Sequence, residues 1–398
     1  MIVTSKWVSD VATVPPFHLV VIGNPNGQRI DHLQAALNRL NLPPAQVVPY
    51  TDLIAGRVRL PDVMKSDSLL RIESPDKDFE TYRAFLKLGS EPAASERSEF
   101  LLPEEVDRLQ FEKGRLWPSR QWYLGFCKTL RLIEVQVAEC LGVQYLQSPL
   151  AIARMFDKRL CQSLFSENGI PVPQSLGPTG CFDELLTTMH QIRCHQVFVK
   201  LAHGSSAAGA VALRINNGRF QAITTVEMVQ ERAHLKLYNS RKIRTYTNPK
   251  EIAELVNALC RHRVQVERWL PKAASGKGCF DLRMVVIAGR VHHIVARTSR
   301  SPFTNLHLLN TRGDLEAIRV RIPDALWHSA VQSCEQAITC FPGSFYAGVD
   351  VLITAGYRSH AVLEINAFGD LLPGVLQNGL DTYSTELLPW LNQRSRSG

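Results

Sequence analysis

The stretch that decides the fold is VLEINAFGDLLPG (362–374), an apolar strand that carries Glu364 and Asn366 two residues apart. A buried carboxylate is costly unless a cation or hydrogen-bond donors meet it, so this strand must face a partner. The preceding residues turn around Gly356-Tyr357, and the whole segment FYAGVDVLITAGYRSHAVLEINAFG (345–369) therefore predicts a β-hairpin. In its register Asp350 lies opposite Glu364, with Asn366 one step along the same face.

Two carboxylates at such close range destabilise each other unless a cation lies between them. Three oxygen ligands on two rigid strands suit Mg²⁺, which takes carboxylates together with substrate phosphates and keeps some water. Asp350, Glu364 and Asn366 are therefore a candidate magnesium site. The alternative is a coincidental polar trio within an apolar hairpin.

A second hairpin is predicted over CFDLRMVVIAGRVHHIVARTSR (279–300), with its turn at Ala288-Gly289. Asp281 and Arg283 share one face by the period-two rule, and the return strand carries Arg297 near its end. Two inward-pointing arginines would bind anions. Arginines on a half-exposed sheet are the alternative.

The segment QVFVKLAHGSSAAGAVAL (196–213) predicts a strand that ends in Lys200, a small-residue loop over 203–210 and another strand. Such loops let backbone N–H groups approach phosphate oxygens, with a cation nearby. The pattern is not a P-loop, because GxxxxGK[ST] is absent and a strand follows. A plain hairpin explains the segment equally well.

The first part of the chain predicts a β-α-β unit and hence a parallel sheet, from FHLVVIG (17–23), an amphipathic helix and AQVVPY (45–50). Its first turn, GNPNG, is not a dinucleotide-binding fingerprint. Residues 1–16 resemble a loose leader. Within 60–147 a strand over 67–74 and two helices are expected, followed by one long helix from 148 that ends at Gly169. Six residues of this region are candidates for a substrate site or, alternatively, for the core and surface: Arg71, Glu73, Ser74, Arg120, Trp122 and Tyr123.

The composition is that of an ordinary globular protein, with 398 residues and a formal net charge of +8 that is spread along the chain. No block of like charges indicates nucleic-acid binding, and no apolar run is long enough for a membrane span. Nine cysteines without CxxC spacing, and no apolar leader, indicate reduced thiols and a cytoplasmic protein. A homodimer is left open.

The order of these features resembles the ATP-grasp superfamily, most closely its RimK and glutathione-synthetase-like branch and a bacterial subfamily of it. The resemblance covers about residues 148–390. It implies an α/β (α+β) ATP-grasp fold after an N-terminal Rossmann-like pre-ATP-grasp domain. The implied domains are 1–147, a lid subdomain at 148–230 and a C-terminal subdomain with the Mg-ATP site at 231–398.

The resemblance also assigns residues. FDK places Lys158 on the nucleotide phosphates, VKLAHGSSAAG places Lys200 on the α and β phosphates, and VERWL is the hinge that binds adenine. TNLH places Asn305 near the γ-phosphate, and Arg283 and Arg297 face phosphate or the acyl phosphate. The full implied nucleotide-binding set is Lys158, Lys200, Gly204, Ser205, Ser206, Gly209, Glu267, Arg268, Trp269, Leu270 and Asn305. Asp350, Glu364 and Asn366 become the ligands of two Mg²⁺ ions, with Mn²⁺ as a substitute.

The activity implied by the resemblance is an ATP- and Mg-dependent carboxylate–amine ligase that forms an acyl phosphate on an amino acid, peptide or small metabolite. An ATP-grasp kinase and a non-catalytic ATP-binding protein are the alternatives. Two departures from the pattern stand out. The segment RWLPKAASGKGCF (268–280) is long, so Lys272 or Lys277 is placed near the phosphates or in solvent, and the usual Pro-Gly is delayed to 373–374, after Asp370.

Overall fold

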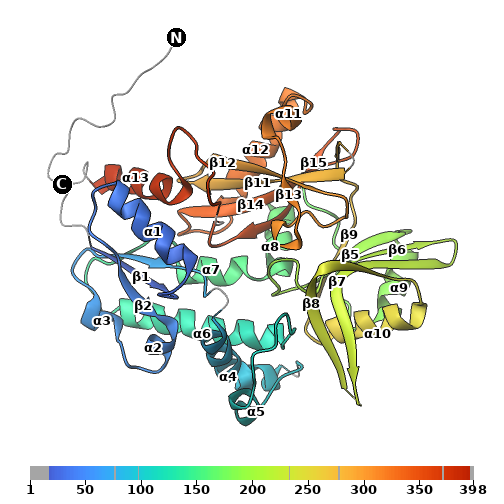
Figure 1. Ribbon diagram of the computed structural model, residues 1–398, viewed down its shortest axis with the longest axis horizontal. Coiled ribbons are helices and arrows are strands. Elements are labelled where there is room, and N and C mark those ends of the chain that lie inside the picture. Colours follow the sequence, from blue (N-terminus) through green and yellow to red (C-terminus); the bar gives the residue numbers. More distant parts are fainter. Residues whose placement is uncertain are drawn as a thin grey trace. The chain divides into compact units, whose positions relative to one another are not determined.

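The computed structural model in Figure 1 confirms the predicted hairpin of the deciding stretch. Strands β14 (Tyr346–Ile353) and β15 (His360–Asn366) pair antiparallel, and Asp350 lies directly opposite Glu364. Leu363 has no partner on β14, because a bulge shifts the register between Asp350 and Val351. The register predicted from the sequence lacks this bulge. It is correct for Asp350 and Glu364, but it is off by one residue for the pairs between the bulge and the turn.

The structure describes residues 18–75, 78–96, 98–232, 234–276, 278–369 and 372–394. The predicted leader, Lys277 and Asp370 lie outside the described residues. The chain forms two compact units. The first combines 1–76, 136–146 and 371–398, and the second combines 77–135 and 147–370. The predicted subdivision at 147 and 230 stays a prediction.

The first unit is built on a parallel sheet of four strands in the order β2-β1-β3-β4, as the β-α-β pattern predicts. The strands are β1 (Leu19–Gly23), β2 (Gln46–Pro49), β3 (Leu69–Ile72) and β4 (Gln144–Tyr145). The helices are α1 (Gln28–Arg39), α2 (Tyr50–Ile54), α3 (Leu60–Val63) and α13 (Thr382–Arg394). Helices α1 and α13 pack against each other, so the last segment of the chain completes the first unit.

The second unit contains two antiparallel sheets. The five-stranded sheet has the order β8-β7-β6-β5-β9 and buries its core against helices α9 (Phe182–Gln191) and α10 (Pro249–Cys260). Its strands are β5 (Gln196–Leu201), β6 (Val211–Asn216), β7 (Arg219–Glu231), β8 (His234–Tyr246) and β9 (Val264–Arg268). The strand, loop and strand predicted over 196–213 are therefore confirmed.

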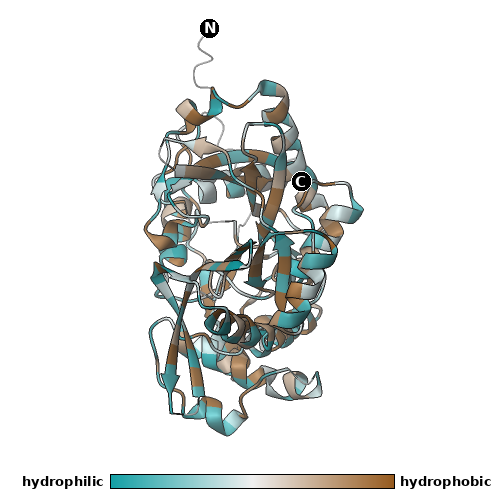
Figure 2. Ribbon diagram, turned by 90° about the vertical axis from the view of Figure 1, so that its right-hand side faces the viewer, coloured by the Kyte–Doolittle hydropathy of each residue, from teal (hydrophilic) through white to brown (hydrophobic). Residues whose placement is uncertain are grey.

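The other sheet has the order β13-β12-β11-β14-β15, with β10 paired to β11, and α12 (Asp324–Thr339) packs on it. The remaining elements are β10 (Ala274–Ser275), β11 (Gly278–Ile287), β12 (Arg290–Ser299), η1 (Leu306–Leu308), β13 (Thr311–Arg312) and α11 (Leu315–Arg319). The hairpin of β11 and β12 turns at Ala288-Gly289 as predicted. Hydrophobic residues concentrate on the strands of the protein (Figure 2), and β14 is buried along its whole length.

Helices α4 (Phe79–Ser95) and α6 (Ser119–Val137) cross where each has a glycine. A Cβ atom on Gly125 would lie 1.8 Å from the carbonyl oxygen of Phe85, and one on Gly89 would lie 1.9 Å from that of Gln121. The two backbones therefore touch, and no larger residue fits at either position. A short helix, α5 (Pro103–Asp107), packs on α4.

The single long helix expected from residue 148 is wrong. The chain forms α7 (Pro149–Met155) and α8 (Lys158–Glu167), which are separated at Phe156-Asp157. The Asp157 carboxylate accepts hydrogen bonds from the N–H groups of Arg159 and Leu160, and such capping starts a new helix. Gly169 adopts a φ of +69° beyond the end of α8, as the predicted stop requires.

Two further sequence expectations concern the whole chain. All nine cysteines are free thiols. Within the described ranges, we find no helix with the length and hydropathy needed to cross a membrane.

Candidate functional site

The carboxylates of Asp350 and Glu364 meet because their strands pair at that position. Asn366 lies opposite Gly348, and its Nδ2 donates to the Gly348 carbonyl at 3.3 Å, so its Oδ1 is not used in that bond. Asp350 is only 4% exposed. The Glu364 side chain is 27% exposed. A buried carboxylate that lies opposite a second carboxylate requires positive charge nearby.

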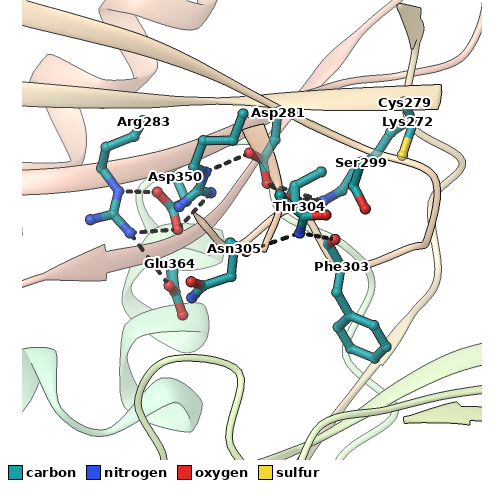
Figure 3. Close-up of polar contacts among 12 residues, drawn as sticks. Lys272, Cys279, Asp281, Arg283, Ser299, Phe303, Thr304, Asn305, Asp350 and Glu364 are labelled. Atoms are coloured by element: carbon teal, nitrogen blue, oxygen red, sulfur yellow. Dashed lines mark hydrogen bonds and ion pairs between the residues drawn. The ribbon is translucent and has the colours of Figure 1, made fainter. Parts of the chain in front are cut away.

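Two arginines from neighbouring strands supply that charge to Asp350, and one of them, Arg283, is labelled in Figure 3. Arg283 on β11 lies opposite Asp350, and its Nε and Nη2 donate to the two carboxylate oxygens, the latter at 2.9 Å. Arg297 on β12 brings its Nη2 to 3.0 Å from Asp350 Oδ2. A bidentate guanidinium fixes the plane of the carboxylate as well as neutralising it.

Arg297 also forms an ion pair with a second carboxylate, that of Asp281, which lies opposite it in the hairpin of β11 and β12. Its Nε donates to Asp281 Oδ1 at 2.7 Å. Lys272 Nζ donates to Asp281 Oδ2 at 3.0 Å and to Thr304 Oγ1 at 2.6 Å, and the Thr304 hydroxyl donates to Asp281. Burial alone would raise the pKa of Asp281, but Arg297 and Lys272 hold it well below its usual range.

Glu364 has a different set of cations. Lys158 Nζ lies 3.6 Å from its Oε2, and Arg283 Nη2 lies 3.9 Å from its Oε1. Burial opposes ionisation, but Lys158, a hydrogen bond with Asp350 and Arg283 together lower the pKa of Glu364. Burial raises the pKa of Asp350 in spite of its two guanidinium partners, with Glu364 adding to the rise. The surrounding cations therefore stabilise the ionised form of Glu364 more fully than that of Asp350.

Lys158 joins this carboxylate pair to the small-residue loop. Its Nζ donates to the Gly204 carbonyl at 2.7 Å, and its backbone N–H donates to the Ala202 carbonyl at 3.0 Å. Lys200, at the end of β5, forms an ion pair with Glu267 on β9. Burial opposes its charge, but Glu267 raises the pKa of Lys200.

The loop itself has an unusual backbone. Ser206 and Ala207 both have positive φ values of 54° and 58°, and Gly209 follows with 68°. Non-glycine residues in this region carry strain that is typical of functional loops. In the described part of the chain no acceptor binds the N–H groups of Ser205, Ser206, Ala207 and Gly209. Such groups are available to an anion.

A buried histidine supports the base of this loop. His203 is 5% exposed, its ring stacks on Tyr123, and its Nε2 lies 3.3 Å from Asp157 and 3.1 Å from Arg120. Its Nδ1 has no hydrogen-bond partner among the described residues. Burial lowers the pKa of His203 to about 4, against the pull of Asp157. A neutral imidazole therefore lies between the loop and α8.

These groups surround one cavity, which contains about 830 Å³ of empty space, open solvent included. Most of the sequence-predicted residues line it, namely Lys158, Lys200, Gly204, Ser206, Glu267, Arg268, Leu270, Arg297, Asn305, Asp350 and Glu364. Five do not appear in its wall, namely Ser205, Gly209, Trp269, Arg283 and Asn366. The cavity wall also contains Lys272, Asp281 and Thr304.

Solved structures share this architecture. The ATP-grasp ligase PsnB, complexed with a phosphomimetic variant of a minimal precursor, Mg and ADP, aligns with a TM-score of 0.51 and 13% identity over 95% of this chain and 99% of its own. The chain has the ATP-grasp fold. The D-cycloserine synthetase DcsG gives a TM-score of 0.54 at 11% identity over 94% of this chain and 99% of its own. The macrocyclase MdnC from Microcystis aeruginosa MRC, bound with precursor peptide MdnA, gives 0.51 at 12% identity over 94% and 99%. No family model and no curated protein matches the sequence.

In this ATP-grasp fold the segment expected to be the hinge already uses much of its backbone. The N–H of Arg268 donates to the Gln174 carbonyl at 2.8 Å, and that of Trp269 donates to the Gln196 carbonyl at 3.1 Å. The Trp269 carbonyl accepts from the Gln196 side chain. Leu270 alone among the four hinge residues has neither its N–H nor its C=O bonded within the described residues.

The sequence prediction missed the role of Asp281, Thr304 and Lys272 as one group. Counting from the turn at 288–289 places Asp281 opposite Ala296, and a bulge between Val285 and Val286 shifts it opposite Arg297. No pattern predicts Lys272, because its partner Asp281 is reached only when the segment after β9 folds back onto β11. Within the described residues no cluster of three His, Cys, Asp or Glu side chains is arranged for a metal ion.

The candidates in 60–147 lie in different surroundings. Arg71 is buried in the first unit, where its Nε lies 2.9 Å from Glu73 and its Nη1 lies 2.6 Å from Glu386. The Ser74 N–H donates to Glu73 at 3.0 Å. In the second unit Arg120 pairs with Glu96 at 2.6 Å. Trp122 packs among aromatic rings, including Phe126, which agrees with a core residue.

Proposed function

We propose that the protein is an ATP- and Mg²⁺-dependent carboxylate–amine ligase. The observation that carries this proposal is the Asp350–Glu364 pair, surrounded by cations, in a cavity whose wall includes Ser206 and Ala207 of the small-residue loop. The names of the solved neighbours support the class, since they include an ATP-grasp ligase and a synthetase. Phosphoryl transfer needs positioning and charge neutralisation, and these residues provide both.

The nucleotide phosphates would bind between the small-residue loop and the two lysines. The N–H groups of Ser205, Ser206, Ala207 and Gly209 are available as donors, and Lys158 and Lys200 add positive charge. Both lysines are now paired with carboxylates, so they are held in place before a nucleotide arrives. We assign adenine to the cavity wall at Leu270, whose backbone is available for hydrogen bonds.

The carboxylate pair fits Mg²⁺. A carboxylate offers about four lone-pair directions. Among the described residues, Arg283 and Arg297 make three contacts to the Asp350 oxygens, which leaves one direction for a cation. Glu364 and the Oδ1 of Asn366 complete an all-oxygen set. Asp350, Glu364 and Asn366 would hold the ion, which would neutralise the negative charge that develops on the phosphates.

The reaction begins when a substrate carboxylate oxygen attacks the γ-phosphorus and the bond to the bridging oxygen breaks, which releases ADP and leaves an acyl phosphate. Arg283 and Arg297 lie where they can stabilise the negative charge of this transfer. An amine nitrogen then attacks the acyl carbon, loses a proton and expels phosphate. The loop over the cavity would exclude water, which otherwise hydrolyses the acyl phosphate.

The test is a product analysis. The protein is incubated with Mg²⁺, ATP and mixtures of carboxylates and amines, and products are identified by mass together with ADP and phosphate. We expect an amide and free phosphate, and we expect Asp350→Asn and Glu364→Gln to abolish both. The matched control is Glu335→Gln, which alters a carboxylate that pairs with Arg290 outside the cavity.

The outcomes discriminate among the three functions. A phosphorylated hydroxyl product with no amide would show a kinase. Nucleotide binding without turnover for any substrate mixture would show a non-catalytic protein. Full turnover in the Asp350→Asn, Glu364→Gln double variant would refute the site assignment.

A further inference from the structure

Strand β8 contains an insertion beside the candidate active site. Thr224 pairs with Arg244 and Val226 pairs with Asn239, so the four residues Ser240–Ile243 lie opposite Thr225 alone. We call these four residues the β8 bulge. The Lys242 N–H donates to Ser240 Oγ at 3.1 Å, which gives the bulge a defined turn.

The β8 bulge is anchored at the cavity. Ile243 packs against a small hydrophobic cluster that includes Ala210, Phe303 and Leu308. Ala210 and Phe303 also line the cavity, and β8 contacts η1, which follows Asn305. The bulge therefore forms part of the rim of the site, between the small-residue loop and η1.

The rim carries two cations that lack an ion-pair partner in the part of the chain that the structure describes. Arg241 and Lys242 are exposed, and neither forms an ion pair within the described residues. Other cations of β8 do have partners, since Lys236 lies 3.8 Å from Glu112 and Arg244 pairs with Glu227. The two bulge cations are therefore available to a ligand, whereas their neighbours are neutralised.

The surrounding strands strengthen this positive charge. Residues 211–247 contain seven Lys or Arg and two Glu, a net charge of +5 within the chain's formal +8. The positive charge is therefore denser in this region than in the chain as a whole. The two bulge cations are few for a nucleic-acid surface, because a protein that binds DNA can make roughly six to ten phosphate contacts. The packed Ile243 leaves no apolar side chain of the bulge for a membrane.

The same edge of the sheet already accepts an extended chain. Strand β8 is the terminal strand, and residues 114–116 pair with it just before the bulge, with Leu116 N–H donating to Leu237 at 2.9 Å and Asn239 N–H donating to Gly114 at 2.6 Å. In the described residues no strand pairs with Arg244–Tyr246 on the side away from β7. Backbone groups of a peptide could therefore bind beyond the bulge.

We propose that the β8 bulge binds an acidic peptide, whose Asp or Glu side chains pair with Arg241 and Lys242 while one carboxylate enters the cavity. This inference rests on the proposed function and names its carboxylate substrate. Opposite charge across such a rim accelerates association and selects the partner. In such a peptide some carboxylates would pair with Arg241 and Lys242, and another would enter the cavity and be activated by ATP.

The test measures binding without ATP. A labelled short peptide that alternates Glu and Gly is titrated with the protein by fluorescence anisotropy, beside the same peptide with Gln in place of Glu. We expect the Glu peptide to bind at least about tenfold more tightly, and the difference to shrink as salt is raised. Free glutamate at an equal carboxylate concentration should not compete effectively.

Charge reversal locates the surface. Arg241→Glu with Lys242→Glu should weaken Glu-peptide binding at least about tenfold. The matched control, Lys128→Glu with Arg131→Glu, makes the same charge change on the exposed side of α6 and should leave binding unchanged. Melting temperatures of both variants establish that they fold.

Each result has a definite meaning. Equal binding of the Glu and Gln peptides, or equal loss in both double variants, overturns the inference. Tighter binding of single-stranded DNA or of anionic vesicles than of the Glu peptide also overturns it. Failure of the proposed function looks different, because the peptide would still bind but no amide or phosphate would form in the presence of Mg²⁺ and ATP.

Discussion

Asp350 and Glu364 lie directly opposite each other, yet different cations neutralise them. Asp350 is held by the guanidinium groups of Arg283 and Arg297, whereas Glu364 lies 3.6 Å from the ammonium group of Lys158. The two carboxylates therefore link three segments of the second unit that are far apart in the sequence. A substitution that removes either carboxylate therefore leaves its neighbouring cations available to bind another anion.

Removing the charge of Asp350 should make ADP binding independent of Mg²⁺, because the freed Arg283 can then bind the phosphates directly. In Asp350→Asn, Arg283 loses its bidentate carboxylate partner, so metal-free ADP should bind about threefold to tenfold more tightly while Mg²⁺ no longer helps. Isothermal titration of ADP with Mg²⁺ and with EDTA checks both effects. An unchanged Mg²⁺ dependence in this variant would place the metal elsewhere.

Lys272 should stabilise the fold through Asp281. Lys272→Met leaves a buried carboxylate with Arg297 as its remaining cation, so the free energy of unfolding should fall by about 3 kcal/mol. Urea denaturation measures this loss. Adding Asp281→Asn to the same protein should restore part of it, because no unpaired buried charge then remains. If the two losses simply add, Lys272 and Asp281 do not act as a pair.

Acid should destabilise the second unit through His203. Its pKa is about 4 in the folded protein, below the unfolded value of about 6.5, so the unfolded chain binds the extra proton between these values. The free energy of unfolding should therefore fall as the pH drops from 6.5 towards 4, by about 1.4 kcal/mol per pH unit.

His203→Gln should remove this part of the pH dependence, and unfolding experiments at a series of pH values measure the slope. The control His190→Gln alters an exposed histidine at the end of α9. Equal slopes in the unmodified protein and in His203→Gln would show that another group is responsible.

Gly125→Ala should disrupt the crossing of α4 and α6. The added methyl group would lie 1.8 Å from a backbone oxygen, which cannot move without shifting a helix, so the loss should exceed about 3 kcal/mol. Gly180→Ala is a suitable comparison, because its nearest neighbour is the flexible carboxylate end of Glu184 at 3.1 Å. Thermal melting distinguishes the two, and equal melting temperatures would contradict the close approach.

The sequence predicted the carboxylate pair because strand pairing has a fixed period and the assumed register, centred on residue 357, is the one found beyond the bulge. The same rule failed at Leu363, since a bulge depends on local packing and leaves no mark in the alternation. Asp157 was missed as a helix start because the apolar spacing continues through it. Lys272 could not be predicted because its partners come from a chain reversal whose path no local pattern specifies.

The first unit closes only with the last helix of the chain. Arg71 lies on β3 and is 1% exposed, and it pairs with Glu386 on α13. During synthesis the first three strands of the parallel sheet emerge roughly 300 residues or more before that partner, and domains generally fold as units. A chain that stops at residue 370 should therefore leave residues 18–75 open to protease, which limited digestion can measure. The ribosome must release nearly the entire polypeptide before its earliest strands can reach their final, protected state.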